Sequence, residues 1–308
     1  MYFPYFRGRQ YELLALRELV QNRLLGKSVM PVVEPIKITP TLNTTMAAYV
    51  EAEMHISLIL NPAVGDLVKN TTAYDALYSQ YFNNSYVIPA LLLGRSSHGV
   101  IEFLASKGLS KDSVLTLLDK RDSLDMFNSL FSDRKPKYTL CPYDRHFSRA
   151  AGDSRVLFDD RFNKQDKNAD YPPDEFFSDD HTDFEVGNYI GFGDYSVIGN
   201  NFDESGFAPR AVAIHIVYLT SDYILRVKHF VSDTNIDTSD VAGKFGEAVS
   251  KLMVWYSDGQ HRQLTSGLAT LLDYAATGYF PGLPTIKKLS IMHHLELMSK
   301  YLEGGRSI

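Results

Sequence analysis

Short apolar runs recur along the chain and are the first feature of its pattern. Within each run the apolar residues, many of them Val, Ile and Leu, follow one another without alternation, which is typical of strands buried on both faces of a parallel sheet. Most runs end at a carboxylate, an amide, a glycine or a proline. We interpret the following runs as strands: 29–35, 56–60, 86–93, 114–118, 138–141, 155–158, 189–192 and 211–219.

Helical patterns separate several of these strands. A first helix is predicted over 11–25, because Leu13, Leu16 and Val20 recur at helical spacing. Alternating strands and helices indicate a parallel α/β fold, and about eight strands favour a closed (β/α) barrel of the TIM type. An open, doubly wound parallel sheet is the alternative. Further helices are predicted over 45–54, 74–82, 98–107 and 123–131.

Residues 159–205 interrupt this alternation. They are acidic and dense in Asn, Asp and Gly, and they contain many aromatic residues. Long loops in compact domains are either functional or disordered, and this aromatic content argues against disorder. We therefore expect one barrel-like domain over 1–308, in which 159–205 is an ordered, loop-rich insertion near the sixth and seventh strands that folds over one end of the barrel.

A hairpin and two helices are predicted after this insertion. The run 211–219 is expected to pair with 226–231, and a helix is predicted over 242–256. The C-terminal helix is predicted over 284–303, where Pro284 suits the first helical position.

The composition limits the classes of protein to which the chain can belong. Hydrophobic residues make up 44% of the 308 residues and charged residues 22%, which is ordinary for a globular protein. The net charge of −6 disfavours non-specific binding to nucleic acid. The single cysteine, Cys141, cannot form an intramolecular disulfide, and no apolar run is long enough to span a bilayer. The first ten residues lack an apolar stretch, so we expect no signal peptide. We expect a cytoplasmic protein without a membrane partner.

Polar side chains follow the predicted strands, where a barrel carries its site. Carboxylates that meet there hold a divalent cation such as Mg²⁺ or Mn²⁺, or act as general acid and base. We expect Glu34, Asp159 and Asp194 in these roles. The other interpretation is that such residues cap helix N-termini for structural reasons. The side chains at strand ends are Glu34, Asn61, Arg95, Asp119, Asp159, Asp160 and Asp194.

His215 is a further catalytic candidate, although a histidine inside an apolar run is more often a hydrogen-bonded core residue. His229 lies in the neighbouring predicted strand, and two histidines with a carboxylate would suit a transition metal.

Four side chains are expected to contact a ligand. Arg7 and Arg9 precede the first helix, where guanidinium groups suit a phosphate or a carboxylate. Surface ion pairs are the commoner outcome for such arginines. Asn61 and Arg95 are the other two.

Several blocks of sequence carry a family resemblance. The chain opens with Tyr-Phe-Pro-Tyr-Phe-Arg-Gly-Arg-Gln from Tyr2, and Met-Pro-Val-Val-Glu-Pro follows from Met30. Further blocks are 168–172, 176–179, 191–195, 211–215, 229–233 and 292–296. With these blocks the chain resembles the phage "beta protein" family over essentially its whole length. It is still more similar to an uncharacterised bacterial family, related to the first and known by a locus-derived "sce" name.

The resemblance implies a genomic neighbourhood and does not imply a particular reaction. Members of the family resemble genes of mobile elements and defence islands, and they are often encoded beside a PD-(D/E)xK-like nuclease. We expect a metal-dependent hydrolase of phosphoesters or nucleotides that belongs to a mobile-element or phage-defence system, with a phosphate-containing small molecule or nucleic acid as its ligand. The alternative is a non-catalytic barrel that senses a ligand or partners the adjacent nuclease.

Overall fold

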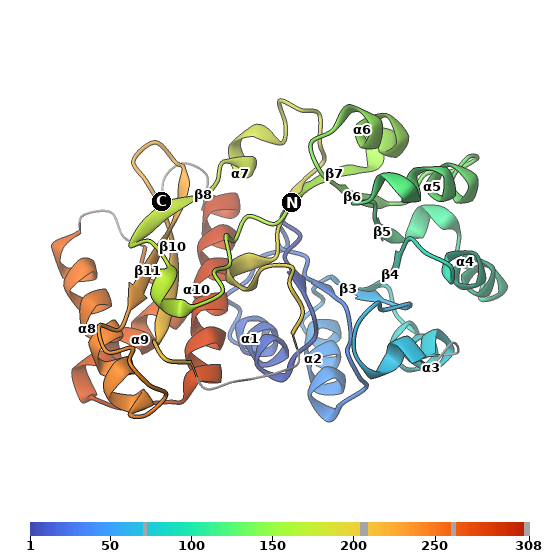
Figure 1. The fold of residues 1–308 in the computed structure, drawn as a ribbon. Helices are drawn as coiled ribbons and strands as arrows, with labels where there is room; N and C mark the ends of the chain where they lie inside the picture. The colour runs from blue at the N-terminus through green and yellow to red at the C-terminus, as the bar shows by residue number, and fades with distance from the viewer. Residues whose placement is uncertain (70–72, 204–208, 260–262, 305–308) are drawn as a thin grey trace. The chain divides into compact units, whose positions relative to one another are not determined.

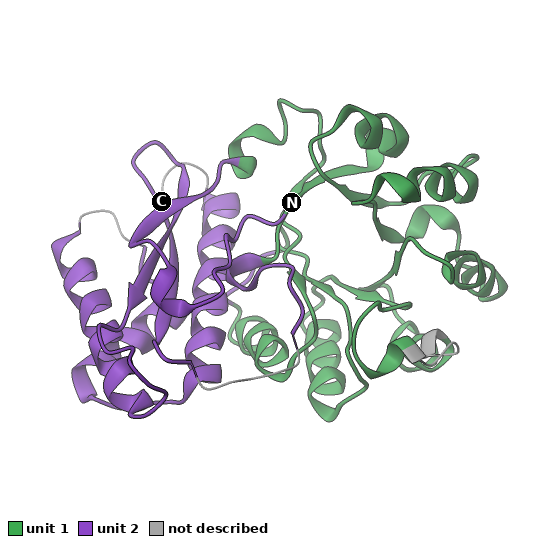
Figure 2. Cartoon of the chain, in the orientation of Figure 1, with its two compact units in different colours: residues 1–23, 27–159, 180–195 green, residues 24–26, 160–179, 196–308 purple. Residues whose placement is uncertain are grey.

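The computed structural model describes the whole chain except residues 70–72, 204–208, 260–262 and 305–308 (Figure 1). Contacts divide the chain into two compact units (Figure 2). Unit 1 comprises 1–23, 27–159 and 180–195, and unit 2 comprises 24–26, 160–179 and 196–308. The hairpin of 211–219 forms a sheet of its own with a strand from the insertion, and this sheet has its own helices. A single domain over 1–308 remains a prediction.

Unit 1 contains an eight-stranded parallel sheet that is nearly closed into a barrel. Each strand pairs in parallel with the next, and β9 follows β7. A parallel bridge between Phe192 and Tyr2 joins the last strand to the start of the chain, where the Phe3 amide donates to the Phe192 carbonyl at 2.8 Å. The predicted α/β barrel is therefore confirmed. The strands are β1 Tyr5–Phe6, β2 Val32–Val33, β3 Ile56–Ile59, β4 Val87–Leu92, β5 Leu115–Leu117, β6 Tyr138–Cys141, β7 Arg155–Phe158 and β9 Phe192–Gly193.

Helices follow the strands of unit 1 and lie outside the sheet (Figure 1). Local signals start some of them: Pro40 is in the first turn of α2, and the Thr39 hydroxyl accepts a hydrogen bond from the Leu42 amide at 3.1 Å. The α-helices are α1 Gln10–Gln21, α2 Pro40–Glu51, α3 Ala73–Tyr81, α4 Ser97–Ser106, α5 Leu124–Leu130, α6 Arg145–Ala151 and α7 Asp180–Asp183. The short 3₁₀ helices are η1 Asp66–Lys69, η2 Lys111–Ser113, η3 Arg121–Ser123 and η4 Gly152–Ser154.

Two of the predicted assignments of barrel strands differ from the structure. The first barrel strand is β1, which was not predicted, because two aromatic residues beside Pro4 are too short a run to show a pattern. The run 211–219 was counted among the barrel strands and instead belongs to unit 2. Both α10 (Leu283–Gly304) and α8 (Val241–Asp258) pack against this strand, so most of its residues are apolar, as in a barrel strand.

Unit 2 is built on a three-stranded antiparallel sheet with the order β10, β11, β8. The predicted hairpin is confirmed, and its register pairs Ala213 with Val231 and Leu219 with Leu225. The predicted C-terminal helix is confirmed as α10, whereas α9 was not predicted. The elements are β8 Asp174–Ser178, β10 Ala213–Leu219, β11 Leu225–Val231, α8 Val241–Asp258, α9 Ser266–Thr277, α10 Leu283–Gly304, η5 Asn168–Asp170 and η6 Ser196–Ile198.

The predicted insertion 159–205 therefore contributes elements to both units. Its strand β8 joins the sheet of unit 2, while α7 and β9 belong to unit 1. Among the described helices, none combines the length and the apolar character that crossing a membrane requires.

Candidate functional site

Glu34, directly after β2, lies at a strand end of the barrel as expected. Its side chain is fully buried and accepts hydrogen bonds from the Tyr5 hydroxyl at 2.7 Å and the Ala63 amide at 2.6 Å. The Arg7 guanidinium forms an ion pair with the same carboxylate. Because all these donors come from neighbouring βα segments, Glu34 ties the ends of β1, β2 and β3 together.

Aromatic rings surround this ion pair. The Arg7 guanidinium lies 5.2 Å from the ring centroid of Tyr5 and 5.6 Å from that of Tyr195. Burial raises the pKa of the Tyr5 hydroxyl well above its usual value, so this group remains a neutral donor to Glu34. Asp194 is also buried and accepts from the Tyr2 hydroxyl at 2.8 Å.

The other predicted side chains of the barrel are not gathered into one site. The Asn61 amide bridges two strands, because it donates to the Leu92 carbonyl at 2.8 Å and accepts from the Leu92 amide at 2.9 Å. Arg9 is the N-cap residue of α1. Asp159 and Arg95 are exposed, and within the described part of the chain Arg95 makes no hydrogen bond or ion pair.

Within the described part of the chain, the predicted metal ligands do not gather into a cluster. Over the residues that the structure describes, no three His, Cys, Asp or Glu side chains gather so that they would hold a metal ion. Glu34, Asp159 and Asp194 therefore do not form such a set. The physical reason at Glu34 is that its oxygens already accept from Tyr5, Arg7 and Ala63.

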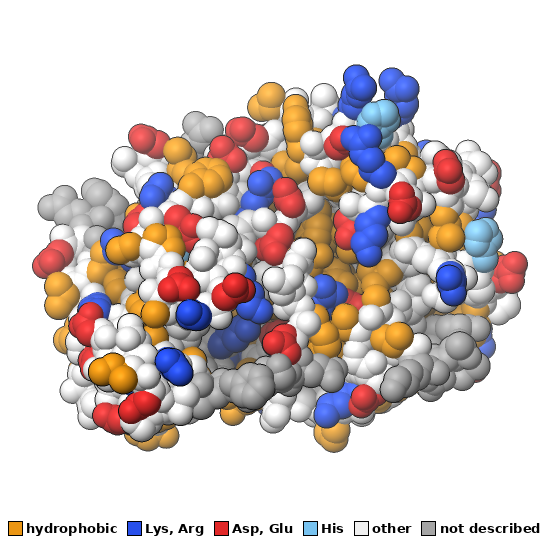
Figure 3. Space-filling view, viewed as in Figure 1, with side chains coloured by type: hydrophobic (Ala, Val, Ile, Leu, Met, Phe, Trp, Pro, Cys, Tyr) orange, Lys and Arg blue, Asp and Glu red, His pale blue; other side chains and the backbone are white. Residues whose placement is uncertain are grey.

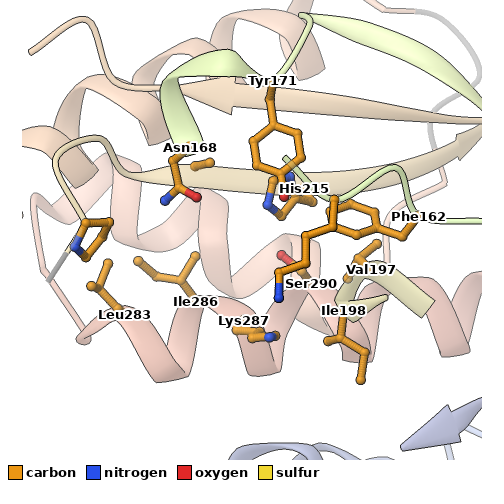
Figure 4. Close-up of a pocket in the computed structure, with 13 residues that line it drawn as sticks. Phe162, Asn168, Tyr171, Val197, Ile198, His215, Leu283, Ile286, Lys287 and Ser290 are labelled. Atoms are coloured by element: carbon orange, nitrogen blue, oxygen red, sulfur yellow. The ribbon is translucent and has the colours of Figure 1, made fainter. Parts of the chain in front are cut away.

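A cavity of about 210 Å³ lies wholly within unit 2 (Figure 4). One wall is a single face of α10, because Leu283, Ile286, Lys287 and Ser290 follow the spacing of successive helical turns. The loop that precedes β8 contributes the opposite wall, and His215 of β10 lines the cavity between them. The loop residues at the cavity are Phe162, Lys164, Asn168 and Tyr171.

His215 is the first of three side chains that lie in a row across the sheet. It stands directly opposite His229 in the hairpin register, and the two Nδ1 atoms are 2.7 Å apart. On the far side of His229, its Nε2 atom lies 3.0 Å from Oε1 of Glu175, which belongs to β8. The strand order β10, β11, β8 thus connects the cavity to a carboxylate through two imidazole rings.

Aromatic side chains hold these imidazoles in place. The ring of Tyr171 stacks on His229 with centroids 4.7 Å apart, and it meets His215 edge-on at 4.6 Å. Phe162 meets His215 edge-on at 5.0 Å, and the Phe162 amide donates to Asp160 at 3.2 Å, which fixes the loop. The row of polar groups is therefore enclosed on its sides by apolar surface.

Burial keeps both histidines neutral. Loss of solvent lowers the pKa of His215 well below its usual value, and the electrostatic effects of His229 and Lys287 lower it further. Loss of solvent also lowers the pKa of His229, against the opposing effect of Glu175 and Asp174. Two neutral imidazoles that share one hydrogen bond must have complementary tautomers.

The carboxylate determines which tautomers these are. Because a carboxylate only accepts, Nε2 of His229 carries the proton that is donated to Glu175. Nδ1 of His229 then accepts, so Nδ1 of His215 is the donor between the rings. The proton-free atom of His215 is Nε2, for which no hydrogen bond occurs within the described part of the chain. A neutral imidazole with such an atom is a base.

The charge at the cavity is positive. Lys164 and Lys287 line it, and among its described lining residues none is acidic. Asn168 is held by a hydrogen bond from its Nδ2 atom to the Ala211 carbonyl at 2.8 Å, and Ser290 on α10 is buried. The arrangement suits a small anion with an apolar part, placed beside a neutral base.

His215 was named from the sequence, and His229 was placed in the neighbouring predicted strand. Glu175, Lys164 and Lys287 were not identified. No local motif marks them, since they come from segments that only the sheet register and the α10 face bring to His215.

No family model, no curated protein and no solved structure matches the chain. The resemblance to the phage beta protein family, the nuclease partner and the cytoplasmic location remain predictions.

Proposed function

We propose that unit 2 binds a small phosphoester in the cavity beside His215 and hydrolyses it. The observation that carries the proposal is the lining of this cavity, which combines two lysines, no acidic side chain and a neutral histidine. Lysine ammonium groups bind phosphate as point charges, and a neutral imidazole activates water by taking its proton.

The local charge contrasts with the rest of the chain. The net charge is −6, and acidic and basic side chains are interspersed over the face drawn in Figure 3. A lining with only basic charges is therefore a local feature that favours an anionic ligand over a neutral or cationic one. Phe162, Ile198 and Ile286 add apolar surface for the alcohol part of the ester.

The role of the lysines is tested by binding, with phenyl phosphate, benzoate and phenol as probes in isothermal titration calorimetry. Phenyl phosphate should bind, phenol should not, and benzoate shows whether any organic anion suffices. Replacing both cations, as Lys164→Ala with Lys287→Ala, should weaken binding by roughly tenfold or more, because hydrogen bonds to charged groups contribute about 1.5–3 kcal/mol each. Lys120→Ala removes an exposed lysine of unit 1 and serves as the charge-matched control.

Turnover is tested with p-nitrophenyl phosphate. His215→Asn should lower kcat by about a hundredfold or more, as expected when a general base is lost, while phenyl phosphate still binds. Binding without turnover in the wild type would overturn the hydrolase half of the proposal and leave a ligand-binding protein. Equal binding by the wild type and the double lysine variant would overturn the site itself.

A further inference from the structure

We propose that Glu175, His229 and His215 form a proton relay in which Nε2 of His215 takes the proton of an O–H group in the cavity. This inference rests on the proposed phosphoester site, since the O–H group is that of the attacking water. His215 is the catalytic base, whereas His229 and Glu175 act through it and are positioning residues.

The geometry supports a continuous path for protons. The Nδ1 atoms of His215 and His229 are 2.7 Å apart, and Nε2 of His229 is 3.0 Å from Glu175. Three adjacent strands supply one residue each, so the path follows the pairing of the sheet. Asn163 donates to the second oxygen of Glu175 at 3.1 Å, which orients the carboxylate.

The step is balanced in atoms and charge. Water gives a proton to Nε2 of His215, and its oxygen forms the new bond to phosphorus. The Nδ1 proton of His215 moves to Nδ1 of His229, so that the positive charge rests on the imidazolium beside Glu175. The bond from phosphorus to the alcohol oxygen breaks, the relay runs backwards, and His215 returns its proton to the leaving oxygen.

The charged groups that face the relay favour this direction of transfer. Lys287 on α10 and Lys164 in the loop lie at the His215 end, where a second positive charge is unfavourable. Glu175 and Asp174 on β8 lie at the His229 end, and both favour a positive charge there. Asp174 is itself neutralised by Arg226 at 2.6 Å and Lys228 at 3.5 Å, so Glu175 is the principal acceptor.

The tautomers are tested first, because they need neither a ligand nor a variant. Long-range ¹H–¹⁵N spectra of the wild-type chain at neutral pH report which ring nitrogen carries each proton. The relay requires Nδ1 of His215 and Nε2 of His229 to be protonated and Nε2 of His215 to be free. The opposite tautomer of His215, or a doubly protonated ring, would overturn the relay.

The function of the base is tested by comparing inorganic phosphate with sulfate. At pH 7 phosphate carries an O–H group and sulfate does not, while their shapes are alike. Phosphate should bind about tenfold more tightly, as expected for one extra hydrogen bond to the base, and should shift the Nε2 resonance of His215. In His229→Phe, which keeps an aromatic ring against Tyr171, this preference should disappear while sulfate binding stays. Glu175→Gln is the second variant if His229→Phe does not fold, and it should lower kcat for p-nitrophenyl phosphate without raising KM.

The outcomes separate this inference from the proposed function. If both anions bind equally and the lysine variants abolish binding, the anion site stands and the relay is overturned. If neither anion binds while the tautomers are as stated, the phosphoester site is overturned and the relay geometry stands.

Discussion

His215 and His229 face each other across the β10–β11 hairpin, with their Nδ1 atoms 2.7 Å apart. The direct register of this hairpin creates the contact. A slip of one strand by one residue would place the two imidazoles on opposite faces of the sheet and break their contact. The base therefore depends on backbone pairing as much as on side-chain chemistry.

The charge of Lys287 should influence how kcat falls on the acid side of its pH profile. This charge helps to lower the pKa of His215, after the effect of burial. His215 acts as a base only when it is neutral, so activity is lost as the pH falls through its pKa. In Lys287→Ala one lowering effect is gone, the pKa of His215 rises, and the acid limb of kcat for p-nitrophenyl phosphate should move to higher pH.

Lys164→Ala is the matched control for this experiment. Lys164 also lines the cavity but is not among the groups that shift the pKa of His215. This variant should raise KM and leave the acid limb in place. An unchanged limb in Lys287→Ala would contradict the electrostatic effect that we assign to this residue.

Neutral buried histidines should make the stability of unit 2 depend on pH. His293 on α10 is buried between the Thr265 hydroxyl at 2.7 Å and the Val217 carbonyl at 2.6 Å. Burial lowers its pKa to about 4, against the opposing effects of the Val217 hydrogen bond and of Glu296. Below about pH 6.5, the pKa of histidine in an unfolded chain, His293 binds a proton in the unfolded chain but not in the folded chain. The free energy of unfolding should therefore fall as the pH drops from 7 towards 4.

Urea unfolding at several pH values measures this effect. Each such histidine contributes a slope of at most about 1.4 kcal/mol per pH unit. His293→Gln cannot titrate, so its slope should be smaller by up to this amount, although its stability at pH 7 also falls. His146→Gln replaces an exposed histidine of α6 and should retain the wild-type slope. Equal slopes in all three proteins would contradict the assignment to His293.

The barrel was predictable because parallel strands buried on both faces are continuously apolar. The same signal misplaced 211–219, since a strand that packs against both α8 and α10 is as apolar as a barrel strand. It also missed β1, whose two residues, Tyr5 and Phe6, are too few for any period. Local pattern therefore identified the elements but did not assign each strand to its sheet.

The cavity was only partly predictable for a related reason. His215 and His229 were placed in neighbouring predicted strands, and the hairpin register brings them into contact. Glu175 reaches them through the pairing of β11 with β8, where the register shifts between Leu225 and Arg226. Such a shift leaves no trace in a single sequence.

Glu34 should prove structural rather than catalytic. Its buried carboxylate holds Tyr5, Arg7 and the Ala63 amide, so Glu34→Ala leaves the Arg7 charge without its partner. Breaking a buried ion pair in this way costs about 3–5 kcal/mol. Asp119→Ala removes an exposed carboxylate at the end of another barrel strand and should change stability by no more than about 0.5 kcal/mol. Urea unfolding measures both changes in stability. A Glu34→Ala variant as stable as the wild type would contradict the structural role and make Glu34 a catalytic candidate again.

Asn61 should behave as a clamp between strands and not as a ligand contact. Its amide exchanges two hydrogen bonds with the backbone of Leu92 and donates a third to the Ser96 hydroxyl at 3.1 Å. Asn61→Ala should therefore lower stability by about 1–3 kcal/mol, since the part-buried backbone groups of Leu92 lose their partners. Asn61→Asp should lower it at least as much, because a carboxylate facing the Leu92 carbonyl accepts and cannot donate.

The measurement for Asn61 is urea unfolding combined with phenyl phosphate titration. Asn83→Ala, at an exposed position before β4, is the control and should unfold as the wild type does. Phenyl phosphate should bind all three folded variants equally, because the cavity draws its lining from unit 2 alone. A loss of binding in Asn61→Ala without a loss of stability would contradict the clamp and support the ligand contact that the sequence predicted.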